Sequence, residues 1–162
     1  MLDKTDWADL IPHAGGMCLL DTVVAWNAGS IHARSDGHRD PANPLRREGH
    51  LHAVHLAEYG AQASAVHGAL QARAAGGGPP RPGMLVSLRD LRLARERIDD
   101  LSGSLDVHAD CLYADDAGAQ YSFRIEHAGS VIASGRVAVL FAAGGDAGAA
   151  DGDAWPGRGP AC

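Results

Sequence analysis

One carboxylate, Glu58, lies in a segment of mostly small and apolar residues that runs from Leu51 to Leu70. A helix of this composition is usually buried rather than lying on a surface. Burying a lone carboxylate is costly unless it is paired, hydrogen-bonded or functional. We therefore expect Glu58 to be buried in the middle of a helix and to take part in chemistry. The structural alternative is a hydrogen bond to Gln62, one helical turn later, or to a backbone amide of a loop.

Nine histidines could act together with this carboxylate. A histidine and a glutamate can remove a proton from one carbon and protonate a leaving group on the next. This requires an apolar environment that keeps the carboxyl partly protonated near neutral pH. His52, His55 and Glu58 are three residues apart and could form a metal site, but no second cluster with ligand spacing supports one. We expect neither a metal ion nor a cofactor.

Composition excludes several classes of function. A formal net charge of -6 argues against a nucleic-acid binder that depends on phosphate contacts. The three cysteines lack metal-ligand spacing, which favours a reducing, cytoplasmic location. No apolar stretch approaches the roughly 18 residues of a membrane-spanning helix, so we expect no membrane association. The hydrophobic share of 46% and the charged share of 21% are typical of a soluble globular domain.

The order of the predicted elements indicates a fold class. A short helix at residues 4–11 precedes two strands, a long helix and four further strands. The first two strands are expected at 17–26 and 30–35, the helix at 51–73, and the later strands at 84–95, 104–113, 119–127 and 130–141. Consecutive hairpins form an antiparallel sheet, which needs an apolar helix to cover one face. This predicts an α+β protein with the hotdog fold, a long central helix wrapped by a curved antiparallel sheet.

The domain is expected to span residues 1–142. A Gly/Pro-rich segment at 76–83 separates the helix from the later strands. Residues 143–162 are rich in Gly, Ala and Asp and have no apolar period, which predicts a disordered tail.

Three segments resemble the hotdog 3-hydroxyacyl-[acyl-carrier-protein] dehydratases, and in particular the branch found in aryl-polyene and xanthomonadin-type pigment clusters. They are LIPHAGGMCLLD at Leu10–Asp21, EYGAQASAVH at Glu58–His67 and GMLVSLR at Gly83–Arg89. The resemblance implies that His13 and Glu58 are catalytic. His50 is the second choice for the histidine, because it precedes the helix as the histidine does in the better-known dehydratase branch.

Substrate contacts follow from the same resemblance. Gln62, Met84 and Leu85 would bind substrate, the last two by lining the acyl tunnel. The helical spacing separately puts Gln62 one turn from Glu58, close enough to orient it by hydrogen bonding. The substrate would be an acyl chain tethered to acyl carrier protein, processed in fatty-acid-like or pigment biosynthesis. Subunits of this kind pair with their helices side by side, which implies a homodimer or a heterodimer with a related subunit. The arginines at 46–47 and 89–97 would then meet the acidic carrier protein.

Two other functions stay open. In an acyl thioesterase, Glu58 would activate water instead of acting as an acid. The chain also reads Glu48-Gly49-His50-Leu51 where the better-known dehydratases have a Gly-His-Phe-Pro-Gly loop. This departure favours the third possibility, a non-catalytic acyl-binding subunit that supports an active partner.

Overall fold

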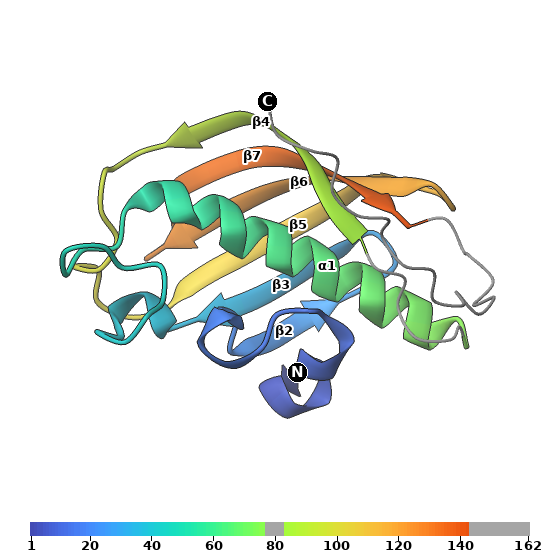
Figure 1. Ribbon diagram of the computed structural model, residues 1–162, viewed down its shortest axis with the longest axis horizontal. Helices are drawn as coiled ribbons and strands as arrows, with labels where there is room; N and C mark the ends of the chain where they lie inside the picture. Colours follow the sequence, from blue (N-terminus) through green and yellow to red (C-terminus); the bar gives the residue numbers. More distant parts are fainter. Residues whose placement is uncertain (77–82, 143–162) are drawn as a thin grey trace, which may run out of the picture.

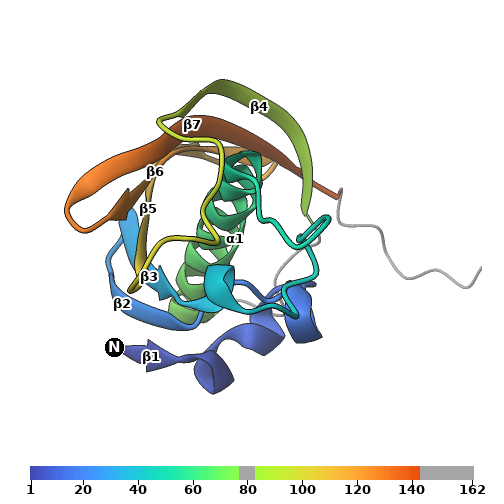
Figure 2. The same cartoon turned by 90° about the vertical axis from the view of Figure 1, so that its left-hand side faces the viewer.

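A long helix crosses the concave face of one curved antiparallel sheet (Figures 1 and 2). The computed structural model describes residues 1–76 and 83–142. The helix is α1 (Leu56–Ala74), and the strands are β1 (Leu2–Asp3), β2 (Thr22–Trp26), β3 (Ser30–Ser35), β4 (Gly83–Leu93), β5 (Leu105–Ala114), β6 (Gly118–His127) and β7 (Ser130–Phe141). Their order in the sheet is β1-β2-β3-β5-β6-β7-β4. The predicted α+β hotdog fold is confirmed.

The core lies between α1 and the sheet. Side chains alternate along β6, so that Tyr121, Phe123 and Ile125 point toward the helix and are buried. Small residues let the helix come close to the strands. Gly60 faces Phe123 so closely that a β-carbon on the glycine would lie 2.4 Å from the aromatic ring. The missing side chain at Gly60 therefore lets the Phe123 ring lie against the helix.

The turns between strands contain residues that suit tight turns. Ala128 and Gly129 link β6 to β7 with φ values of 49° and 77°, the left-handed conformation that two-residue hairpins need. Between β5 and β6, the side chain of Asp115 accepts hydrogen bonds from the backbone N–H groups of Ala117 and Gly118. Asn27 accepts in the same way within the turn from β2 to β3.

Element boundaries differ from the sequence prediction in three places. Residues 4–11 form two short 3-10 helices, Lys4–Asp6 and Ala8–Leu10, because a segment this short gains little as an α-helix. The first long strand begins at Thr22 rather than 17, because the backbone before it bonds to side chains instead of to a neighbouring strand. The helix begins at Leu56 rather than 51, after a 3-10 turn at Ala53–His55.

The sequence did not predict β1, which is only two residues long and pairs with β2. The expected tail at 143–162 and most of the Gly/Pro-rich segment lie outside the described residues. Among the helices described, none has the length and apolar character needed to cross a membrane.

Candidate active site

His13 and Glu58 meet although they are far apart in the sequence. The Nε2 atom of His13 lies 3.1 Å from Oε1 of Glu58. His13 directly follows Pro12, before the 3-10 turn at Gly15–Met17, and Glu58 is the third residue of α1. The two residues predicted to be catalytic are therefore brought together within one chain.

The pair is less buried than the sequence predicted. The side chains of His13 and Glu58 are 30% and 31% exposed. Since α1 begins five residues later than expected, Glu58 lies in its first turn instead of its middle. The expectation of a fully buried carboxylate is thus wrong, and both side chains can be reached from outside the chain.

Gln62 holds the Glu58 carboxylate in place and is itself fully buried. Its Nε2 donates to Oε1 of Glu58 at 2.8 Å and to the backbone oxygen of Met17 at 2.8 Å. Its Oε1 accepts from the backbone N–H of Leu19 at 3.0 Å. The amide therefore joins α1 to the segment that carries His13. A residue with these contacts can orient Glu58.

The contacts leave a specific set of atoms available. Oε1 of Glu58 accepts the hydrogen bond from Gln62 and also contacts Nε2 of His13, whereas Oε2 has no partner among the described residues. Nδ1 of His13 is also without a hydrogen-bond partner there, although it is enclosed. Oε2 of the carboxyl is consequently the atom best placed to meet an incoming hydroxyl group.

The other predicted site residues lie elsewhere. Met84 and Leu85 begin β4 at the edge of the sheet, with 67% and 47% of their surface exposed, and among the described residues they are not part of the cluster around Glu58. Nδ1 of His50 lies 3.8 Å from Oδ2 of Asp99. Within this chain it is His13, and not His50, that contacts Glu58.

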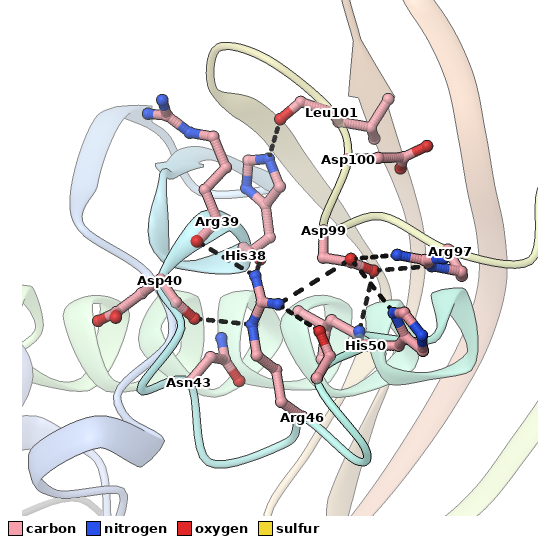
Figure 3. A network of polar contacts seen from close by, with 12 residues as sticks. His38, Arg39, Asp40, Asn43, Arg46, His50, Arg97, Asp99, Asp100 and Leu101 are labelled. Carbon is pink, nitrogen blue, oxygen red and sulfur yellow. Dashed lines mark hydrogen bonds and ion pairs between the residues drawn. The ribbon is translucent and has the colours of Figure 1, made fainter.

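A second polar cluster surrounds Asp99 before the start of α1 (Figure 3). Arg97 forms two hydrogen bonds to its carboxylate, at 2.6 and 3.2 Å, and the backbone N–H of Leu51 donates a third. The hydrogen bond from Arg97 holds the pKa of Asp99 far below its usual range, despite partial burial. This cluster ties the segment after β4 to the chain that leads into the helix.

Arg46 has a structural role that the sequence did not reveal. Its guanidinium donates to the backbone oxygens of four residues in the loop before the helix (Figure 3): His38, Arg39, Asp40 and Gly49. Only 14% of its side chain is exposed. Arg46 therefore stabilises the loop from inside. Its neighbour Arg47 is exposed and donates only to the nearby backbone oxygens of Pro44 and Arg46.

Two further histidines, His38 and His67, are buried. His67 contacts the hydroxyl of Tyr121 through Nδ1 and the backbone oxygen of Asn27 through Nε2. His38 contacts the backbone oxygen of Leu101. Burial lowers the pKa of both imidazoles. The packing role expected for His67 agrees with these contacts.

The described residues were also compared with the requirements of a metal site. Within residues 1–76 and 83–142, no group of three or more His, Cys, Asp and Glu side chains could hold a metal ion.

A protein-family comparison places these residues in context. Residues 5–147 match the model of the ApeP-like family, described as ApeP dehydratase. This chain belongs to the ApeP-like dehydratase family. A comparison of this ApeP-like chain with curated proteins finds no match.

Solved structures support the fold of this ApeP-like protein. The dehydratase heterocomplex ApeI:P from Xenorhabdus doucetiae contains a chain that is 23% identical, with a TM-score of 0.76, 85% of this chain covered and 91% of that one. A putative thioesterase from Shewanella oneidensis is 11% identical, with a TM-score of 0.59 and coverages of 85% and 93%. A hypothetical thioesterase with coenzyme A from Streptococcus pneumoniae is also 11% identical, with a TM-score of 0.54 and coverages of 75% and 84%.

Proposed function

We propose that this protein dehydrates 3-hydroxyacyl thioesters carried on acyl carrier protein and releases trans-2-enoyl thioesters. The contact between His13 and Glu58, in a chain of the ApeP-like dehydratase family, carries the proposal. Dehydration needs one base and one acid close together, and an imidazole beside a carboxyl group supplies both. The partial exposure of the pair leaves a substrate room to reach it.

The proposed reaction uses the two side chains in sequence. His13 takes the proton from C2 of the acyl chain, and the electrons of that C–H bond form the new double bond to C3. Oε2 of Glu58 protonates the departing C3 hydroxyl, which leaves as water. The pair then consists of an imidazolium and a carboxylate, and their 3.1 Å contact offers a direct route for the proton to return. Gln62 keeps Oε1 of Glu58 turned toward His13 throughout.

The proposal includes the pathway, the cellular compartment and the pairing of subunits. We place the protein in fatty-acid-like or aryl-polyene and xanthomonadin-type pigment biosynthesis, in the cytoplasm, paired with a copy of itself or with a related hotdog subunit. The ApeI:P heterocomplex supports a partner subunit of related fold. The free cysteines Cys18 and Cys111 suit a reducing compartment. Met84 and Leu85 would line the acyl tunnel once a partner subunit covers β4.

The test is an assay of purified protein with a 3-hydroxyacyl carrier-protein substrate, alone and together with a related hotdog subunit from the same genome. Mass spectrometry of the carrier distinguishes the outcomes. Loss of one water from the acyl chain supports a dehydratase, provided that Glu58→Gln abolishes it. Release of free acid would identify a thioesterase instead. Turnover that needs the partner and is unchanged by Glu58→Gln would make this chain the non-catalytic subunit.

A further inference from the structure

His55 lies one helical turn before Glu58. It directly precedes the first residue of α1, and its backbone is already helical, with a φ of -68° and a ψ of -13°. Residues three apart on a helix are neighbours, with β-carbons roughly 5–6 Å apart. Both residues are half-buried, so they share the side of the helix start that the core does not cover. His55 therefore lies beside the Glu58 carboxyl group without being the histidine that contacts it.

The imidazole of His55 has no hydrogen-bond partner within residues 1–76 and 83–142. Only its backbone is engaged there, through an N–H that donates to the oxygen of His52 at 3.1 Å. A neutral imidazole carries one N–H donor and one acceptor nitrogen. Because the ring is only half-buried, these atoms are open to a molecule that approaches Oε2 of Glu58. The free donor of His55 and the free oxygen of Glu58 are thus offered together.

The surroundings of this ring favour its neutral form. Burial lowers the pKa of His55. The nearby cationic groups of His52 and Arg47 lower this pKa further, and the Glu58 carboxylate acts in the opposite direction. Arg47 donates to backbone oxygens and pairs with no carboxylate of the described chain, so its charge is not neutralised locally. The neutral form suits the acid role of Glu58, because an imidazolium beside it would favour the carboxylate over the carboxyl group.

A 3-hydroxyacyl thioester would bring two oxygen atoms to this place. Its C3 hydroxyl departs, and its C1 carbonyl oxygen gains negative charge while the proton on C2 is removed. A hydrogen-bond donor directed at that carbonyl oxygen stabilises the transition state and contributes about 10²–10³-fold to kcat. The two oxygens are only two carbons apart, which matches side chains that are neighbours on one helix. With Oε2 of Glu58 at the hydroxyl, the His55 imidazole is the adjacent side-chain donor for the carbonyl.

We propose that His55 is a third catalytic residue, whose neutral imidazole donates a hydrogen bond to the thioester carbonyl oxygen. The inference rests on the proposed function in taking a 3-hydroxyacyl thioester as the substrate. No proton leaves the His55 imidazole. His13 takes the C2 proton, and the carbonyl oxygen holds part of the resulting charge in the transition state. These electrons form the double bond between C2 and C3 as the hydroxyl departs with the proton of Glu58.

Steady-state kinetics of two substitutions test this role. His55→Ala should lower kcat about 10²–10³-fold and leave KM nearly unchanged, because the hydrogen bond strengthens in the transition state. His55→Gln keeps an N–H donor and should recover part of this loss. The pH profile of kcat should keep both limbs of the wild type in each variant, since His13 and Glu58 still supply the base and the acid. If His55→Ala does not fold, His55→Phe fills the same space without a donor and replaces it.

Vibrational spectroscopy detects the hydrogen bond without turnover. The probe is butyryl-pantetheine labelled with carbon-13 at its carbonyl, which lacks the C3 hydroxyl and cannot be dehydrated. Its carbonyl stretch should move to lower frequency on binding to the wild type, because hydrogen bonding weakens the C=O bond. The shift should disappear in His55→Ala and persist in Glu58→Gln.

His108→Gln is the matched control for both measurements. His108 is also half-buried and its side chain forms no hydrogen bond among the described residues. It lies on β5 between the buried residues Val107 and Ala109, so its side chain points to the face of the sheet away from α1. The control should keep the kcat and the carbonyl shift of the wild type.

Three results would overturn the inference: a kcat of His55→Ala equal to that of His108→Gln, a limb of the pH profile lost in His55→Ala, or a carbonyl stretch that does not shift on the wild type. Failure of the proposed function gives a different result. A chain that shifts the carbonyl stretch through His55 but releases no water from 3-hydroxyacyl carrier protein would refute the dehydratase and support the carbonyl contact.

Discussion

Phe123 of β6 occupies the space that a β-carbon on Gly60 would need. An ideal β-carbon there would lie 2.4 Å from Cγ of the ring and 2.5 Å from Cδ2, well inside van der Waals contact. Gly60 is two residues beyond Glu58 on α1. The contact therefore sets how closely the helix and its carboxylate lie against the sheet.

Gly60→Ala should destabilise the protein by about 1–3 kcal/mol, because the added methyl group forces the ring or the helix to move. Urea denaturation measures the change. Gly68→Ala is the matched control on the same helix, where the nearest atom to the new β-carbon is the Tyr121 hydroxyl at 3.8 Å. The control should be neutral or stabilising by up to about 1 kcal/mol, since alanine favours a helix. An equal loss of unfolding free energy in Gly60→Ala and Gly68→Ala would contradict this explanation.

Glu58→Gln and His13→Asn should each lower kcat by a factor on the order of 10²–10⁴, the usual contribution of an acid or base. Circular dichroism should be unchanged, because both side chains are partly exposed. The double variant should be little worse than the more damaging single one, since the two residues share one proton cycle. If the double variant instead lost kcat by the product of the two single factors, the two residues would act independently.

Gln62→Ala should reduce both stability and kcat. The variant leaves the buried N–H of Leu19 and the backbone oxygen of Met17 without their partner, at a cost of about 1–3 kcal/mol. Because the side chain is buried and only positions Glu58, kcat should fall while KM changes little. Gln120→Ala, at an exposed position on β6, is the control for both measurements. A large rise in KM alone would instead favour direct substrate contact by Gln62.

Arg46→Met should destabilise the fold by about 3 kcal/mol, whereas Arg47→Met should change stability by no more than about 0.5 kcal/mol. The two residues are neighbours of the same type, but Arg46 is mostly buried and donates to four backbone oxygens across the loop. Arg47 is exposed and donates only to the nearby backbone oxygens of Pro44 and Arg46. Thermal or urea unfolding of the pair tests this difference. Similar losses for the two would show that the loop does not depend on the guanidinium of Arg46.

Acid should weaken the fold through His38 and His67. Burial lowers the pKa of both in the folded state, so the unfolded chain binds more protons as the pH falls below about 6.5. Stability should therefore decrease in that range, by up to about 1.4 kcal/mol per pH unit for each histidine. Urea unfolding at a series of pH values measures the slope. A slope unchanged in His67→Gln would exclude this histidine as a contributor.

Local patterns predicted much of the fold and part of the site. The four-residue spacing of Glu58 and Gln62 was enough to predict their contact, and the succession of short strands predicted the hairpins. Resemblance to a family, rather than spacing, indicated His13. The bond from Leu19 to Gln62 was not predictable, because it joins residues 43 positions apart. The start of α1 was placed too early because the 3-10 turn before it has the same apolar composition as the helix.

The hydrogen bonds made by Gln62 connect residues 17–19 with α1, so the whole candidate dyad and its support lie between residues 13 and 62. Among the described residues, strands β4 to β7 contribute no side chain to this dyad or to the hydrogen bonds of Gln62. The dyad and the amide that supports it are therefore encoded by one short, continuous stretch of the gene.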